Sequence, residues 1–181
     1  RIAETKNFVS TKTVAPMPKL NGDKAKEYLE QQGLSESLGE AIQAAQVKKL
    51  LASDGGTGDF FGHSVALSGN TAIVGAFSDN NQGGFQQGSA YIFERNSGGA
   101  NNWSEIKKLT ASDAANADFF GYSVAIDRDT AIVGAPDQSG GSNSAGAIYI
   151  FERNAGGANN WGQVRKRTPD DGVANDSFGL S

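Results

Sequence analysis

Residues 61–76 read FGHSVALSGNTAIVGA, and residues 120–135 read FGYSVAIDRDTAIVGA. The match extends on both sides, so that residues 47–110 resemble residues 106–168. A third copy begins at Asp171 and reaches Phe178 and Gly179 just before Ser181. The chain is therefore a tandem repeat with a period of about 58 residues.

Each repeat contains four short runs of strand-forming residues. The second run, TAIVGA, is continuously apolar, as a strand covered on both faces should be. Small residues at Gly75 and Gly134 would let neighbouring backbones approach closely. The expected strands are 61–67, 71–76, 89–95 and 103–110, followed by 120–126, 130–135, 146–153 and 161–168. Four antiparallel strands with Gly-rich turns predict one blade of a β-propeller per repeat.

The composition favours a turn-rich, mainly β fold. The chain of 181 residues has 24 glycines, no cysteine and a net charge of −4. No basic stripe suggests a nucleic-acid partner, and no stretch approaches the ~20 apolar residues of a membrane span. We interpret the short basic runs at 107–108 and 165–167 as solvated strand ends. The absence of cysteine excludes disulfides and thiol chemistry.

The motifs resemble a known repeat family. Phe-Gly at 61–62 with Val-Gly-Ala at 74–76, and Phe-Gly at 120–121 with Val-Gly-Ala-Pro at 133–136, resemble the FG-GAP repeat. That repeat builds the propeller of integrin alpha chains and of many bacterial surface or secreted proteins. The resemblance covers about three quarters of the chain, and Phe77 stands where the family has proline. It implies two blades, at about 61–110 and 120–168, and a third that begins near 171.

Family propellers often carry a calcium loop between the first and second strands of a blade. Here that connection is only SGN at 68–70 or DRD at 127–129, too short to supply the six to eight oxygens that Ca²⁺ requires. The resemblance therefore carries no calcium site to these positions. Calcium elsewhere in the chain is left open. Propellers also need four to eight blades, so a ring requires further blades from the same or another chain.

Acidic pairs precede the Phe-Gly element in every repeat. One interpretation is a cation site, and the other is turn chemistry in which aspartates accept backbone N–H bonds. The pairs are Asp54 with Asp59, Asp113 with Asp118, and Asp171 with Asp176. The long loops between the second and third strands offer further candidates for ligand binding, which are Asp79, Asn80, Asn81 and Asp137.

No catalytic constellation emerges from the remaining residues. His63 is the only histidine, and Tyr122 occupies its position in the second repeat, so we interpret it as a strand-face residue. Trp103 and Trp161 could stack on sugars, but their identical placement favours packing. We expect a protein that is not an enzyme.

The N-terminal region has a different composition. We expect an extended arm over 1–20 and a short helical segment over 21–46, with blades over 47–181. The stretch YLEQQGLSESLGEAI at 28–42 is similar to the docking helices of kinase regulatory subunits.

These features predict a non-catalytic binding or scaffolding module that contacts a protein or glycan through its loops, at the cell surface or secreted. The alternatives are a structural assembly protein docked through its N-terminal helices, in an intracellular or ciliary setting, or a non-catalytic appendage of a larger enzyme.

Overall fold

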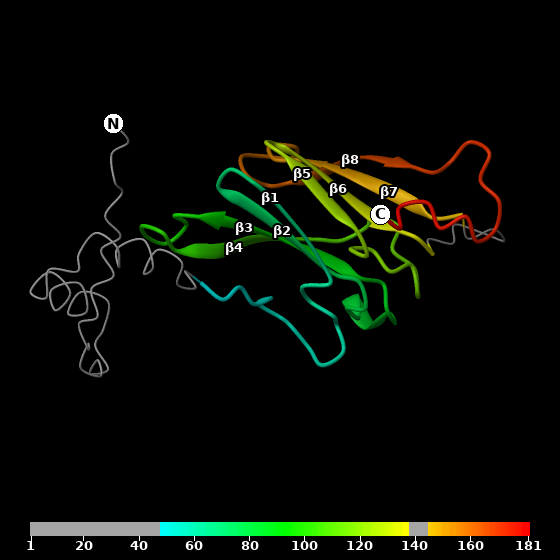
Figure 1. Cartoon of the computed structure of the whole chain (residues 1–181), viewed down its shortest axis with the longest axis horizontal. Coiled ribbons are helices and arrows are strands. Elements are labelled where there is room, and N and C mark those ends of the chain that lie inside the picture. Colours follow the sequence, from blue (N-terminus) through cyan, green and yellow to red (C-terminus); the bar gives the residue numbers. More distant parts are fainter. Residues whose placement is uncertain (1–47, 138–144) are drawn as a thin grey trace, which may run out of the picture. The chain divides into compact units, whose positions relative to one another are not determined.

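The computed structural model describes residues 48–137 and 145–181, which form two four-stranded antiparallel sheets (Figure 1). The first sheet contains β1 (Ser64–Ser68), β2 (Thr71–Ala76), β3 (Ser89–Arg95) and β4 (Trp103–Leu109). The second sheet contains β5 (Val124–Asp127), β6 (Thr130–Ala135), β7 (Ala147–Glu152) and β8 (Gly162–Arg167). Strand order follows the sequence in both sheets, and a 3₁₀ turn, η1 (Asn81–Gly83), lies between β2 and β3. The expected helical segment and extended arm lie outside the described residues.

The first strand of each sheet begins later than the sequence predicts. Phe60 has φ of 56° and Gly62 has φ of 92°, and the His63 N–H donates to the Phe60 carbonyl at 3.1 Å. The second repeat has the same turn, with Gly121 at φ of 89°. The Phe-Gly element is therefore a tight turn ahead of the strand, because left-handed backbone cannot continue a β-ladder.

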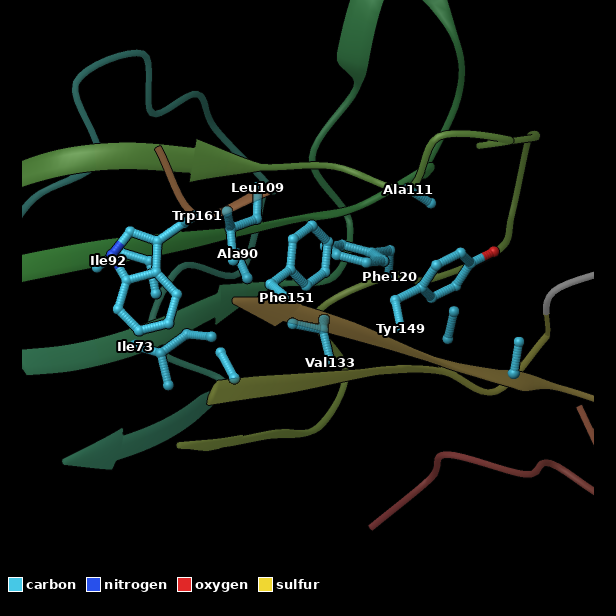
Figure 2. Packing of buried hydrophobic residues seen from close by; sticks show 13 residues of the cluster. Ile73, Ala90, Ile92, Leu109, Ala111, Phe120, Val133, Tyr149, Phe151 and Trp161 are labelled. Atoms are coloured by element: carbon cyan, nitrogen blue, oxygen red, sulfur yellow. The ribbon is translucent and has the colours of Figure 1, made fainter. Parts of the chain in front are cut away.

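The second strand of the first sheet is buried on both faces, as its apolar sequence predicts. Ile73 is 0% exposed and packs into the core between the sheets, while Val74 is 5% exposed on the opposite face. The core between the sheets also contains Ile92 and, from the second sheet, Val133 and Trp161 (Figure 2). Stacking of the two sheets thus buries the apolar face that one sheet alone would expose.

The Phe-Gly turn of the second repeat docks on the first sheet. Phe120 forms a parallel bridge with Gly88 beside β3, and the Ser64 hydroxyl donates to the Gly121 carbonyl at 2.9 Å. A Cβ atom on Gly75 would lie 2.0 Å from that same carbonyl oxygen. The expected close approach at this glycine is confirmed, because the backbone of the next repeat fills the space of its missing side chain.

The third repeat begins in the same way. Phe178 bridges Gly146, and the Ser123 hydroxyl donates to the Gly179 carbonyl at 2.8 Å. A Cβ atom on Gly134 would lie 1.9 Å from the Gly179 oxygen. The start of a third repeat thus docks on the second sheet as the second repeat docks on the first.

The phenylalanine of the turn fills the sheet that follows it. The Phe61 ring meets the rings of Tyr91 and Phe93 edge-on, with centroids 5.5 Å and 6.0 Å apart. The Phe120 ring repeats these contacts with Tyr149 and Phe151 at 5.4 Å and 5.9 Å (Figure 2). The Phe-Gly element of the second repeat therefore joins two sheets, through its backbone to the first and through its ring to the second.

The outer faces of the two sheets remain partly open. Ile132 in β6 occupies the position of Ile73, but it is 37% exposed where Ile73 is fully buried. In the first sheet, Leu67 of β1 is 65% exposed, whereas its counterpart in the second sheet, Ile126 of β5, packs against the core between the sheets. The described residues contain two sheets and no closed ring.

Candidate functional site

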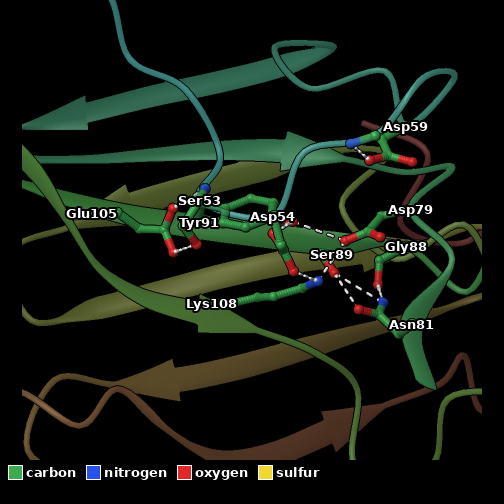
Figure 3. A network of polar contacts seen from close by, with 11 residues as sticks. Ser53, Asp54, Asp59, Asp79, Asn81, Gly88, Ser89, Tyr91, Glu105 and Lys108 are labelled. Atoms are coloured by element: carbon green, nitrogen blue, oxygen red, sulfur yellow. Dashed lines mark hydrogen bonds and ion pairs between the residues drawn. The ribbon is translucent and has the colours of Figure 1, made fainter.

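The first aspartate of the first acidic pair binds two strands. Asp54 accepts a hydrogen bond from the Tyr91 hydroxyl in β3 at 2.8 Å and pairs with the Lys108 ammonium of β4 at 2.6 Å. The same hydroxyl and ammonium contact Asp79 at 2.8 Å and 2.7 Å. Figure 3 shows Lys108 reaching the carboxylates that flank it. The loop before the sheet and the loop after β2 are thus tied to one tyrosine–lysine pair.

The second repeat builds the same arrangement. Asp113 accepts from the Tyr149 hydroxyl of β7 at 2.8 Å and pairs with the Lys166 ammonium of β8 at 2.6 Å. Both ammonium groups also lie over the tyrosine ring that they flank, at 5.4 Å for Lys108 and 5.5 Å for Lys166. The interpretation of these lysines as solvated strand ends was wrong, because both are partly buried ion-pair partners. The signal in the sequence was the recurrence of Asp, Tyr and Lys at the repeat spacing.

These contacts set the protonation of the network. The hydrogen bond from Lys108 holds the pKa of Asp54 below its ordinary value, against the opposing effect of burial. Burial acts to raise the pKa of Asp113, but the hydrogen bonds from Lys166 and Tyr149 outweigh it and the net shift is downward. Burial and the hydrogen bond to an aspartate raise the pKa of the Tyr91 and Tyr149 hydroxyls. At neutral pH Asp54 and Asp113 are therefore carboxylates, and Tyr91 and Tyr149 are neutral phenols.

The second aspartate of each pair shapes a turn. Asp118 accepts the Ala115 N–H at 2.7 Å, and Asp176 accepts the Val173 N–H at 2.7 Å. Asp59 accepts the Gly56 N–H in the same geometry (Figure 3). These bonds from residue i−3 are the turn chemistry that the sequence allows for aspartate. Among residues 48–137 and 145–181, no three His, Cys, Asp or Glu side chains gather in a group that could hold a metal ion.

The loop candidates divide into buried and exposed residues. Asp79 and Asn81 are 6% and 7% exposed, and the Asn81 amide donates to the Gly88 carbonyl and the Ser89 hydroxyl (Figure 3). Asn80 and Asp137 have exposed side chains. Ligand binding through these four residues stays a prediction, and only the exposed pair is accessible to a ligand.

The single histidine lies in the turn before β1, not on the strand itself. Its ring contacts the Phe77 and Tyr122 rings, with centroids 4.6 Å and 4.7 Å apart. Trp161 is 1% exposed in the core between the sheets, as the packing interpretation predicts. Trp103 is half-buried and lines a shallow pocket with Leu67.

A comparison with protein families agrees with this geometry. The FG-GAP repeat profile matches residues 44–93 and 103–151. The chain belongs to the FG-GAP repeat family. In these FG-GAP repeats the Phe-Gly element of one repeat contacts the Gly-Ala element of the repeat before it. The Gly121 carbonyl oxygen occupies the space in which a side chain on Gly75 would lie. No curated protein matches the chain. In the described part of the chain, no helix has the length and apolar character needed to cross a membrane.

Proposed function

We propose that this FG-GAP protein is a non-catalytic binding module, secreted or held at the cell surface, which contacts a protein or glycan through the loops at one end of its sheets. The family match supports this proposal, because FG-GAP repeats are typical of adhesion-type modules.

The observation that carries the proposal is a pre-organised loop surface. Within the loop between β2 and β3, Asp79 and Asn81 bond inward, while Asn80 is exposed and Phe85 is 61% exposed. The loop is also tied to the next repeat, where the Ala117 N–H donates to the Phe85 carbonyl at 2.9 Å. A surface loop that is already ordered loses little conformational entropy on binding, which favours affinity.

The test is a binding screen with the full chain against an array of glycans and a panel of purified extracellular matrix proteins. The variant F85K places a charge at an exposed loop position and leaves in place the inward bonds of Asp79 and Asn81 and the bond that the Asn80 side chain accepts from the Gln86 N–H at 2.8 Å. We expect it to melt at the temperature of the wild type and to lose at least one wild-type interaction. Equal binding by the two proteins, or an enzymatic activity abolished by one substitution, would overturn the proposal.

A second candidate function is structural assembly, which the open face of the second sheet favours. Ile132 is 37% exposed where the equivalent Ile73 is covered by a neighbouring sheet. A further blade would bury that face. Light scattering of the full chain across a concentration series tests this candidate, with the variant Ile132→Lys expected to abolish any association; association that survives the variant would contradict it.

A further inference from the structure

Five aromatic rings gather where the Phe-Gly turns of the first two repeats meet. Phe77 is the centre of this cluster, with ring centroids 5.0 Å from Phe60, 4.6 Å from His63, 5.8 Å from Phe119 and 5.2 Å from Tyr122. We call these five residues the aromatic platform. Four of them come from equivalent positions of two repeats, and the fifth, Phe77, directly follows β2.

The backbone conformation at Phe60 and Phe119 does not require an aromatic side chain. Phe60 and Phe119 both have φ of 56°, and the equivalent Ser177 of the third repeat has φ of 54°. Left-handed backbone costs a bulky residue about 1–2 kcal/mol, and Ser177 shows that a small polar residue makes the same turn. The strained phenylalanines therefore serve something other than the turn itself.

The centre of the platform also departs from the repeat. Pro136 occupies the position of Phe77 in the second repeat, and Ser177 and Leu180 take the positions of the flanking rings in the third. The aromatic platform is thus particular to the junction of the first two sheets. At the next junction the positions of Phe60 and His63 are again aromatic, but the central ring and the two rings on the following repeat are absent. Stacking of repeats therefore does not require the complete cluster.

One ring of the platform presents an open face. Phe60 stacks on Phe77 with an interplanar angle of 23°, and it is nonetheless 60% exposed. One face of Phe60 rests on its neighbour, so the opposite face is open to solvent. An aromatic face carries the negative part of the ring quadrupole, which attracts weakly positive C–H groups.

The platform offers no cationic partner to an anionic ligand. The cation–π contacts of the described residues involve Tyr91, Tyr149 and Trp161, and none involves a platform ring. Asp59, next to Phe60 in sequence, is 8% exposed and already accepts the Gly56 N–H. Within the described part of the chain, an anionic ligand would find no ammonium or guanidinium group over these rings.

A polar rim accompanies the apolar face. The half-buried Gln86 side chain donates an amide N–H to the Ser78 hydroxyl at 3.0 Å, and the Phe119 N–H donates to the main-chain carbonyl of Gln86 at 3.3 Å. Ser78 is 5% exposed, so the polar group that a ligand can reach here is the Gln86 side-chain amide, which has a second N–H and a carbonyl oxygen. A flat aromatic surface with an amide beside it suits a sugar ring, which has C–H groups on its face and hydroxyls at its edge.

We propose that the aromatic platform binds a neutral sugar, whose pyranose ring stacks on the open face of Phe60. The proposal rests on the proposed binding function and assigns its ligand class and site. A protein ligand with aliphatic side chains is the competing occupant.

The experiment screens the full chain against an array of neutral and acidic oligosaccharides and measures the tightest neutral one by calorimetry. The variants Phe60→Ser and Phe77→Pro introduce residues that the chain itself carries at equivalent positions, Ser177 and Pro136, so the local backbone accepts both. We expect each to weaken binding about tenfold or more, the equivalent of about 1.4 kcal/mol. Leu51→Ser, at a site 62% exposed, and Trp103→Phe, at the competing aromatic pocket, should leave affinity unchanged.

The outcomes separate this proposal from the binding function. Binding of only acidic sugars, or neutral-sugar binding that survives Phe60→Ser in a folded variant, overturns the platform and leaves the binding module intact. Sugar binding lost with Trp103→Phe but kept with Phe60→Ser moves the site to the pocket and also overturns it. If a purified protein but no sugar binds, the ligand class is wrong, and if nothing in either panel binds, the proposed function fails as well.

Discussion

Gly75 illustrates how a single residue sets the spacing of the repeats. The Gly121 carbonyl oxygen would lie 2.0 Å, and the Ser64 hydroxyl 2.3 Å, from a Cβ atom on Gly75. Neither neighbour can retreat easily, because they are hydrogen-bonded to each other at 2.9 Å. A side chain here would therefore force the second repeat away from the first.

Alanine at this position should be strongly destabilising. We expect Gly75→Ala to lower the free energy of unfolding by about 2–3 kcal/mol, because the added methyl group overpacks a backbone contact. Gly55→Ala is the control, since a Cβ atom there would come no closer than 3.4 Å to its neighbours, and it should cost under about 1 kcal/mol. Urea unfolding of both variants is the measurement. Equal losses would show that the contact with the second repeat is not what matters.

At the scale of elements, the segment leading into each sheet is anchored to that sheet by side chains. The Ser53 hydroxyl donates to Glu105 of β4 at 2.9 Å, and the Gln163 amide of β8 donates to the Ser112 hydroxyl at 2.9 Å. Asp54 and Asp113 add their bonds to a tyrosine and a lysine. Each lead-in is thus held by side chains from the third and fourth strands.

Stability should respond to pH through these anchors. Asp54 and Asp113 have folded pKa values below the ordinary value of 3.8, so their contribution is present above that value and is lost as the pH falls through the folded pKa. We expect the free energy of unfolding to drop below about pH 4, by at most about 1 kcal/mol per aspartate because both side chains are nearly half exposed. Urea unfolding at pH 7 and pH 3 measures this drop.

The double variant D54N/D113N is the control, because asparagine retains an acceptor for tyrosine but has no charge. We expect the free energy of unfolding of this variant to fall less between pH 7 and pH 3 than that of the wild type. An unchanged acid response in the double variant would contradict the anchoring role of the two aspartates.

At high pH, the raised pKa of Tyr91 and Tyr149 has the opposite consequence for stability. The folded state favours the neutral phenol, so the contribution of these tyrosines to the free energy of unfolding disappears as the pH rises well above 10.

For the whole molecule, Arg153 is a polar link between the two sheets. It follows β7 and forms an ion pair with Glu94 of β3, and it donates to the Thr71 hydroxyl of β2 at 2.8 Å. It also pairs with Asp129 at 2.6 Å and lies over the Trp161 ring at 4.8 Å. One guanidinium thus satisfies groups of both sheets, which its planar array of donors allows.

Loss of this arginine should weaken the junction. We expect Arg153→Ala to lower the free energy of unfolding by about 1–2 kcal/mol, because Glu94 and Thr71 lose their partner at a partly buried site. Arg95→Ala is the matched control at the equivalent position of the first sheet, where the side chain is exposed, and it should cost under about 0.5 kcal/mol. Thermal and urea unfolding compare the two variants; similar losses would refute the link.

Chelation should leave the whole molecule unaffected. Asp54 and Asp113 are engaged by lysine and tyrosine, and Asp59, Asp118 and Asp176 by backbone N–H groups. Asp171 is exposed, and one carboxylate cannot supply the six to eight oxygens that Ca²⁺ requires. We therefore expect the melting temperature with EDTA to match that with added Ca²⁺ within about 1 °C. Differential scanning calorimetry provides the comparison. A calcium-dependent rise would show that ligands outside these pairs bind the ion.

The sequence by itself determined the repeat, the order of the strands and the turn chemistry of aspartate, because these depend on local periodicity and on glycine, asparagine and aspartate at fixed positions. It placed the Phe-Gly element in the first strand of each sheet, where the structure has a turn. It also predicted the close approach at Gly75, since a glycine inside an apolar strand leaves room for a neighbouring backbone. Only the tertiary structure decided which distant side chains meet. Lys108 and Arg153 pair with Asp54 and Glu94, which lie 54 and 59 positions away in the sequence. The recurrence of Asp, Tyr and Lys marks these positions as equivalent between repeats, but it does not say which side chains meet. That depends on how the loops cross each sheet and on how the two sheets pack against each other.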